Sequence, residues 1–190
     1  MVTPIWIMNG VWLAWWVSWM LAAFWSDRAA KRPGIQNEIV YRVVIIAGVL
    51  LLFGFLRMPA AERATRLWHT STALGWTMVA LTIAGLAFTW WARIHLGRLW
   101  SSSVTRKADH HVVDTGPYGI VRHPIYTGVI VAGLATAGLR GTGVAFAGAL
   151  VLVVGWCVKA RLEERFLREQ LGRDAYDAYA ARVPMLIPFA

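Results

Sequence analysis

The chain has 190 residues, of which 58% are hydrophobic, 15% are charged and twelve are tryptophan. A soluble domain carries about 25% charged residues, so this composition excludes an ordinary soluble protein, and its hydrophobicity excludes a disordered one. The single cysteine, Cys157, lies in an apolar run and excludes a disulfide-stabilised secreted fold. The net charge of +9 is carried between apolar segments. This distribution argues against a nucleic-acid-binding surface and indicates a polytopic membrane protein.

Several apolar runs are long enough to cross a bilayer, which takes about twenty residues of helix. Residues 5–25, 39–56 and 70–92 are three such runs, and the first lacks the basic start of a signal peptide. Residues 124–158 are apolar except at Arg140, where Gly141-Thr142-Gly143 predicts a tight turn. The sequence therefore predicts an all-α membrane protein with about five transmembrane helices. The last two would form a hairpin, and an amphipathic cytoplasmic helical segment would follow them.

The basic residues predict an orientation in the membrane. With the N-terminus outside, fifteen of the nineteen Lys and Arg residues would lie on the cytoplasmic side, as the positive-inside rule favours. We expect one domain over residues 1–190, with three transmembrane helices in 1–92, a cytoplasmic loop in 93–123, the transmembrane hairpin in 124–158 and a cytoplasmic segment in 159–190. We expect an integral, multi-pass protein of a prokaryotic inner membrane, with its active site on the cytoplasmic side.

The first polar segment, residues 93–128, contains four of the five histidines: His95, His110, His111 and His123. Adjacent histidines seldom reach one ion together, and no thiol lies nearby, so the spacing does not favour a metal site. Arg122 and the free amides of a helix that begins at Pro124 are suited to bind an anion or a carboxylate. The alternative, which the residues alone leave open, is that this segment only connects two helices.

The second polar segment begins with Glu163 and Glu164, directly after the last apolar run. Carboxylates at a membrane boundary are costly and tend to face a partner or a polar cavity. The alternative is the solvated start of an amphipathic helix. For the later side chains Tyr176, Tyr179 and Val183 we expect such a helix, lying on the bilayer surface.

Several motifs in these two segments resemble one enzyme family. The stretch from His110 to Tyr118, followed by Arg122-His-Pro-Ile-Tyr126-Thr-Gly128, is similar to the isoprenylcysteine carboxyl methyltransferases. The related phospholipid N-methyltransferases share the second of these motifs. The Glu163-Glu164 pair and the closing run from Leu171 to Phe189 also look like those of the family. The resemblance covers about the C-terminal half of the chain, and its specificity comes from the order of the motifs.

The resemblance implies an integral membrane enzyme that binds S-adenosylmethionine without a Rossmann domain, and the chain indeed lacks that domain's Gly-rich fingerprint. It implies that the cofactor is bound by Ser103, His110, His111, Val112, Val113, Tyr118, His123, Pro124, Ile125, Tyr126, Glu163 and Glu164. Arg122 or Lys159 could orient an anionic acceptor, so we count Arg122, Lys159 and Glu163 as catalytic candidates. Lys159 stands where the family commonly has an arginine, and it lacks the bidentate fork of a guanidinium.

The predicted function is S-adenosylmethionine-dependent methyl transfer to a lipophilic acceptor, such as the carboxylate of a prenylated cysteine. The expected partners are this lipophilic substrate and membrane lipid, without nucleic acid or metal. One alternative is a phospholipid or amine N-methyltransferase, and another is an NADPH-dependent enzyme similar to sterol reductases. A non-catalytic membrane scaffold or a transporter is the third alternative.

Overall fold

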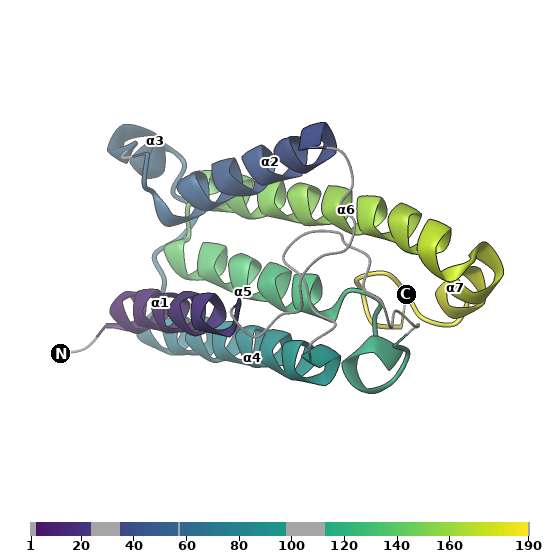
Figure 1. Cartoon of the computed structure of the whole chain (residues 1–190). Coiled ribbons are helices and arrows are strands. Elements are labelled where there is room, and N and C mark those ends of the chain that lie inside the picture. The colour runs from purple at the N-terminus through teal and green to yellow at the C-terminus, as the bar shows by residue number, and fades with distance from the viewer. Residues whose placement is uncertain (1–2, 24–34, 57, 98–112, 190) are drawn as a thin grey trace.

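A computed structural model describes residues 3–23, 35–56, 58–97 and 113–189, and over these ranges the protein is helical (Figure 1). In chain order the elements are α1 (Pro4–Ala23), α2 (Ile35–Phe53), α3 (Pro59–Ala64), α4 (Thr72–Leu96), the 3₁₀ helix η2 (Gly116–Gly119), α5 (Pro124–Arg140), α6 (Gly143–Leu171) and α7 (Arg173–Ala180). An isolated bridge between Arg66 and Thr142 is the one β feature of the described ranges. The predicted all-α fold is confirmed.

The apolar run that begins at Pro124 folds as a hairpin of α5 and α6. Gly141 ends α5 in the left-handed conformation, with φ of 62°, which glycine adopts without the steric cost of a Cβ atom. The Thr142 side chain then caps α6 by accepting a hydrogen bond from the backbone amide of Ala145. The predicted hairpin, with its turn at Gly141–Gly143, is confirmed.

Three described helices are long and apolar enough to cross a membrane: Pro4–Ala22, Thr72–Leu96 and Gly143–Glu169. Helix α5 is apolar but has only 17 residues. These helices fit a multi-pass membrane protein. The expected number of five spans stays a prediction.

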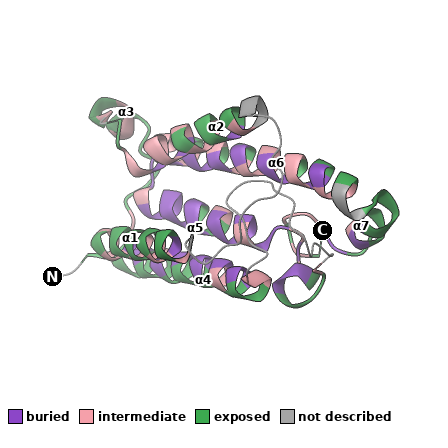
Figure 2. Cartoon of the chain, in the orientation of Figure 1, coloured by how far each residue is buried: buried purple, intermediate pink, exposed green. Residues whose placement is uncertain are grey.

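Small residues bring neighbouring helices close together. A Cβ atom on Gly85 of α4 would lie 2.6 Å from the carbonyl oxygen of Gly128 in α5. A Cβ atom on Gly155 of α6 would lie 2.7 Å from Cγ1 of Ile45 in α2. Such contacts let backbones pack tightly where lipid tails weaken the hydrophobic driving force. As a result α4 runs beside α5, α2 runs along α6, and α5 is buried along most of its length (Figure 2).

Helix α1 attaches to this core through two tryptophans. The indole Nε1 of Trp12 donates to Oγ1 of Thr136 in α5 at 2.9 Å, and that of Trp15 donates to Oγ1 of Thr89 in α4 at 2.8 Å. On the outer side of the helix, Trp6 and Trp16 are exposed. These two partly buried indoles thus have hydrogen-bond partners in the neighbouring helices, as buried indoles usually do.

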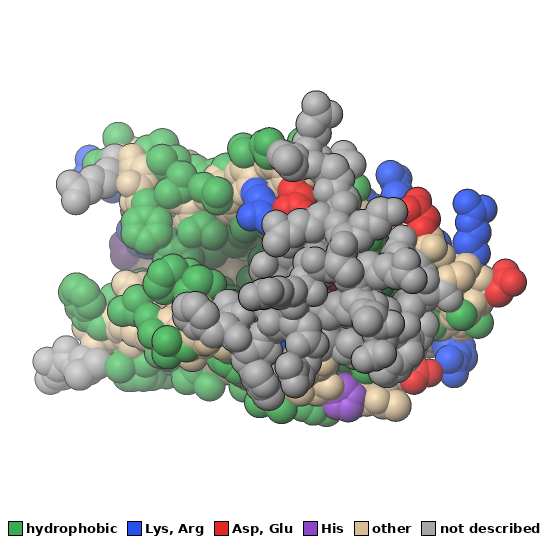
Figure 3. Space-filling view, in the orientation of Figure 1, with side chains coloured by type: hydrophobic (Ala, Val, Ile, Leu, Met, Phe, Trp, Pro, Cys, Tyr) green, Lys and Arg blue, Asp and Glu red, His purple; other side chains and the backbone are tan. Residues whose placement is uncertain are grey.

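The C-terminal segment packs on protein, and its expected position on the bilayer surface is wrong for three residues. Tyr176, Tyr179 and Val183 are 2%, 4% and 8% exposed and pack against one another and Leu167. Because Leu167 belongs to α6, these side chains cover the end of that helix. Helix α7 lies at this end (Figure 1). On the face shown in Figure 3, charged side chains gather at this end, and hydrophobic ones cover much of the opposite end.

Candidate active site

The candidate site lies where α5 begins. His123 is the N-cap of α5, and Pro124 occupies the first helical position, where a missing amide costs nothing. The backbone amides of Arg122 and His123 donate to the carbonyl oxygens of Pro184 at 2.9 Å and Met185 at 3.1 Å. The C-terminal segment thus lies across the start of α5 and uses amides that precede the helix.

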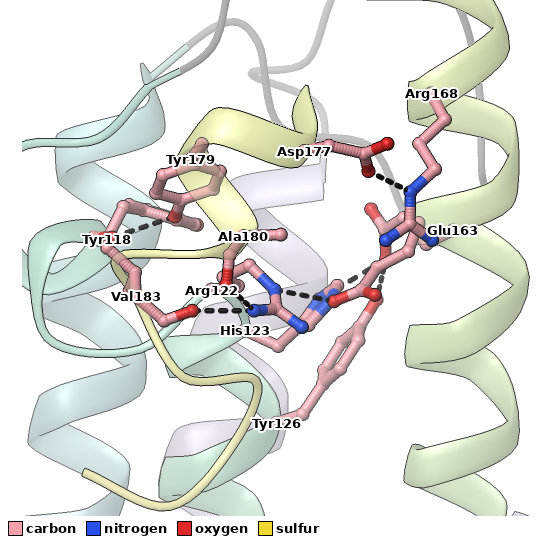
Figure 4. A network of polar contacts seen from close by, with 11 residues as sticks. Tyr118, Arg122, His123, Tyr126, Glu163, Arg168, Asp177, Tyr179, Ala180 and Val183 are labelled. Atoms are coloured by element: carbon pink, nitrogen blue, oxygen red, sulfur yellow. Dashed lines mark hydrogen bonds and ion pairs between the residues drawn. The ribbon is translucent and has the colours of Figure 1, made fainter. Parts of the chain in front are cut away.

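Arg122 binds groups of the protein itself. Its Nε donates to Oε1 of Glu164 at 2.7 Å, and its Nη1 donates to the carbonyl oxygens of Ala180 at 2.9 Å and Val183 at 2.6 Å (Figure 4). This guanidinium joins α6, α7 and the C-terminal segment at one point. Its catalytic role stays a prediction, and these contacts favour positioning over contact with an acceptor.

The two adjacent glutamates have different surroundings. The Glu164 side chain is 7% exposed, and besides Arg122 it contacts Nε2 of His123 at 3.3 Å. The Glu163 side chain is 28% exposed and accepts a short hydrogen bond from the Tyr126 hydroxyl (Figure 4). Oε2 of Glu163 lies 4.0 Å from Nδ1 of His123, whereas its Oε1 has no hydrogen-bond partner among the described residues. Glu164 is therefore engaged by Arg122 and His123, whereas Glu163 can still receive a ligand.

Aromatic rings form the wall beside Glu163. The rings of His123 and Tyr126 are stacked with centroids 5.2 Å apart, and Tyr126 is stacked on Trp156 at 4.8 Å. The ammonium of Lys159 lies 5.1 Å from the centroid of the Tyr126 ring. Both side chains thus contact Tyr126: Lys159 lies against its ring, and Glu163 accepts a hydrogen bond from its hydroxyl.

The turn before α5 is fixed to α7. The Tyr179 hydroxyl donates to the carbonyl oxygen of Tyr118 at 2.7 Å, and Tyr118 is stacked on His95 at 6.4 Å. Burial raises the pKa of both tyrosines, and the charge of Glu163 adds to the rise in the pKa of Tyr118. Both hydroxyls therefore keep their protons at neutral pH, and Tyr179 remains a donor. Gly116, with φ of 57°, leaves room for the His95 ring.

The structure brings together several residues predicted from the sequence and says nothing about others. It gathers His123, Tyr126, Glu163, Glu164, Arg122 and Lys159 around one point. Pro124 and Ile125 lie in the first turn of α5, and Tyr118 and Val113 lie in the segment before it. Ser103, His110, His111 and Val112 lie outside the described residues. All the assigned roles stay predictions.

No group of three or more His, Cys, Asp and Glu side chains that could hold a metal ion occurs in the described parts of the chain.

Two residues near the site were missed by the sequence analysis. Tyr41 of α2 and Trp156 of α6 lie against Lys159, with ring centroids 5.6 and 5.4 Å from its ammonium. The only sequence signal for them was an aromatic residue in an apolar run, and membrane helices contain many of these.

Comparisons with known proteins bear on this arrangement. A model of the isoprenylcysteine carboxyl methyltransferase (ICMT) family matches residues 78–169. Protein-S-isoprenylcysteine O-methyltransferase B of Arabidopsis thaliana is 33% identical over 112 residues, which cover 58% of this chain and 51% of that protein. The resemblance to this family is confirmed. The Schizosaccharomyces pombe protein-S-isoprenylcysteine O-methyltransferase is 35% identical over 100 residues, covering 51% of this chain and 42% of that protein.

One further curated protein and one solved structure extend the similarity beyond the matched region. The cobalt-zinc-cadmium resistance protein CzcN of Cupriavidus metallidurans is 28% identical over 155 residues, covering 78% of this chain and 62% of that protein. A solved structure of the eukaryotic intramembrane Ras methyltransferase ICMT has a TM-score of 0.56 at 20% identity and covers 84% of this chain and 55% of that chain. This likeness shows a shared fold. The chain spans between 42% and 62% of the lengths of these curated relatives.

Proposed function

We propose that this protein transfers a methyl group from S-adenosylmethionine to a lipophilic acceptor, such as the carboxylate of a prenylated cysteine. One observation carries the proposal. A partly exposed carboxylate, Glu163, lies against the stacked rings of His123 and Tyr126, and these residues lie within the region that the ICMT family matches. A carboxylate with a free oxygen beside aromatic rings suits a ligand that carries positive charge and a flat base.

The described residues fit this cofactor. Glu163 could accept hydrogen bonds from its ammonium or from a ribose hydroxyl, and the rings of His123 and Tyr126 could contact its apolar parts. When bound, S-adenosylmethionine supplies a methyl group on a sulfonium, so that the acceptor's lone pair forms the new bond to carbon and the electrons of the broken S–CH3 bond stay on sulfur. A carboxylate acceptor is already ionised, and therefore no residue of the chain has to remove a proton.

The chain's residues then act by alignment. Arg122 and Glu164 fix the start of α5 to α6 and to the C-terminal segment, and this holds Tyr126 and Glu163 in place. Lys159, which is 8% exposed, could attract an anionic acceptor into an apolar site that excludes water. Orienting the reactants and removing water account for a large share of the lowering of the activation barrier in reactions of this kind.

We further propose that the charged end of the molecule is cytoplasmic and that the N-terminus lies outside, in a prokaryotic inner membrane. The excess of Lys and Arg in the predicted cytoplasmic segments supports this orientation. A lipophilic acceptor would then reach the site sideways from the bilayer. A reporter that is active only in the cytoplasm, fused after Ala190, is expected to be active. An inactive reporter with normal expression would indicate the opposite orientation.

The test is calorimetric titration of the detergent-purified protein with S-adenosylhomocysteine and, separately, with NADPH. We expect binding of S-adenosylhomocysteine alone, weakened about tenfold in Glu163→Ala, since losing one charged hydrogen bond costs about 1.4 kcal/mol or more. Glu169→Ala is the matched control, because Glu169 is exposed on the same helix. Binding of NADPH alone would indicate a reductase. Binding of neither compound would favour a scaffold or a transporter.

A further inference from the structure

An open cavity lies at the end of the bundle opposite α7, beside the starts of α1 and α4 and the turn that joins α5 to α6 (Figure 1). Its volume is about 460 Å³. The guanidinium groups of Arg66 and Arg140 and the imidazole of His69 line it. Glu62 is the one acid among the described residues of its lining. The cavity therefore carries more positive than negative charge.

The single acid does not neutralise both arginines. Oε1 of Glu62 accepts a hydrogen bond from Nη2 of Arg140 at 3.0 Å, and Nη1 of Arg140 donates to the carbonyl oxygen of Phe53 at 3.1 Å. The Nε of Arg140 is buried and has no hydrogen-bond partner within the described ranges. Arg66 is exposed and forms no ion pair with a described residue. One whole cation and one further donor thus stay available to a ligand.

Two helix starts add to the positive potential of the cavity. Helix α4 begins at Thr72 and α6 begins directly after Thr142, and both threonines line the cavity. The first amides of a helix have no acceptor within it, and the helix dipole favours an anion at this end. In α4 the Ser71 hydroxyl accepts from the amide of Leu74 at 3.3 Å, which leaves the two preceding amides without a partner in the helix. Arginines and helix amides together suit a phosphate group, whose oxygens accept several hydrogen bonds at once.

Apolar surface adjoins the cavity. Ile5 and Leu139 belong to its lining, and exposed apolar side chains follow directly in α1 and α4, namely Trp6, Leu74 and Trp76. Both helices are long and apolar enough to cross a membrane, and tryptophan is common at the boundary between hydrocarbon and headgroups. A phospholipid could therefore lay its acyl chains along α1 or α4 and place its phosphate in the cavity.

We propose that this cavity binds a phosphate group, at the end of the bundle away from the proposed active site. The neighbouring apolar surface favours the headgroup of an anionic phospholipid as the source of the phosphate. The positive-inside rule predicts few basic residues at this end in the proposed orientation. Arg66 and Arg140 are two of those few, and both line one cavity, as expected if they hold a ligand there. This inference is independent of the proposed methyl transfer.

The experiment measures the melting temperature of the detergent-purified full chain during titration with dioleoyl phosphatidylglycerol at constant ionic strength. A headgroup in the cavity contacts α1, α4 and the α5–α6 turn, and a ligand that binds only the folded state raises its stability. We expect a saturable rise in the melting temperature, and no rise with dioleoyl glycerol, which has the same chains without the phosphate. Inorganic phosphate is titrated separately, since it has the phosphate without the chains.

Arg66→Met should weaken the apparent affinity for phosphatidylglycerol about fivefold, the scale of one basic residue beside an anionic lipid. Because Arg66 is exposed and has no ion pair among the described residues, the melting temperature without lipid should stay at the wild-type value. Arg63→Met is the matched control, since Arg63 is an exposed cation three residues earlier and does not line the cavity. It should keep the wild-type affinity. Binding of S-adenosylhomocysteine should be the same in both variants.

The two sources of phosphate give different results. A rise with phosphatidylglycerol alone supports a lipid headgroup, whereas a rise with inorganic phosphate that also depends on Arg66 supports the same site and assigns it to a free anion. No rise with either compound would overturn the phosphate site. Equal rises with phosphatidylglycerol and dioleoyl glycerol, or equal losses of affinity in Arg63→Met and Arg66→Met, would overturn it as well.

Discussion

Removing the Glu164 side chain should lower the free energy of unfolding more than removing that of its neighbour Glu163 does. The Arg122–Glu164 pair has an N···O distance of 2.7 Å, with side chains only 12% and 7% exposed. Breaking such a pair from one side costs about 3–5 kcal/mol, because the remaining charge stays buried without its partner. Arg122 keeps two backbone carbonyls as acceptors, so we expect the lower end of this range, about 3 kcal/mol, for Glu164→Ala.

The measurement is thermal unfolding of the detergent-purified variants. In a chain of this size 1 kcal/mol shifts the melting temperature by about 2–4 °C, so Glu164→Ala should melt roughly 6–12 °C below the wild type. Glu164→Gln, which keeps an oxygen for Arg122, should lose about half of that. Glu163→Ala loses one hydrogen bond of a partly exposed side chain, which costs about 1 kcal/mol, and should melt only about 2–4 °C below the wild type. Equal shifts for Glu163→Ala and Glu164→Ala would refute the division of roles between them.

Three other substitutions test separate contacts. Tyr179→Phe removes the hydrogen bond to the Tyr118 carbonyl and should cost about 1 kcal/mol in free energy of unfolding, with earlier proteolysis of the C-terminal segment as a second readout. Gly128→Val should destabilise the α4–α5 contact at Gly85 by about 1–3 kcal/mol through overpacking, and a wild-type melting temperature would contradict this contact. Tyr126→Phe should weaken S-adenosylhomocysteine binding severalfold while the protein stays folded, and unchanged affinity would remove its hydroxyl from the site.

The helices could be predicted from the sequence because their cause is local. Each apolar run in a membrane must satisfy its own backbone hydrogen bonds, and a helix is the one way to do so within a single segment. The turn at Gly141–Gly143 was visible for the same reason, since glycine marks a left-handed residue. The number of membrane spans does not follow from these local rules, because α5, with 17 residues, is short for the bilayer and largely surrounded by protein.

Much of the site follows from the hairpin. Tyr126 and Trp156 lie fourteen and thirteen residues from the ends of α5 and α6 at the turn, so two antiparallel helices with equal rise bring them level, and their rings stack. The same geometry brings the start of α5 close to the end of α6 and joins Arg122 to Glu164. The position of Tyr41 could not be predicted this way. The register of α2 on α6 depends on glycine contacts such as Gly155 with Ile45, and these appear only in the folded structure.

The C-terminal segment shows where sequence patterns are ambiguous. An amphipathic stripe of Tyr176, Tyr179 and Val183 has the same spacing whether it covers lipid or protein. Polar groups elsewhere in the protein favour packing on protein over packing on lipid. The Tyr118 carbonyl and the guanidinium of Arg122 both need partners, and α7 and the residues after it supply them. Unpaired, these groups would be costly at the end of an apolar bundle.

The adjacent positions of Glu163 and Glu164 determine how the end of the hairpin is oriented around the candidate site. Successive residues on a helix point about 100° apart, so the two neighbouring carboxylates approach the His123 ring at different nitrogens, Glu163 near Nδ1 and Glu164 near Nε2. Glu164 faces the start of α5 and contacts Arg122 and His123. These contacts fix the rotation of the end of α6 about its helix axis. With that rotation set, Glu163 accepts the hydrogen bond of the Tyr126 hydroxyl, and the ammonium of Lys159, one turn earlier, lies 5.1 Å from the centroid of the same ring. The buried Arg122–Glu164 pair therefore determines which way two side chains point: Glu163, which is proposed to bind the cofactor, and Lys159, which is proposed to attract the acceptor.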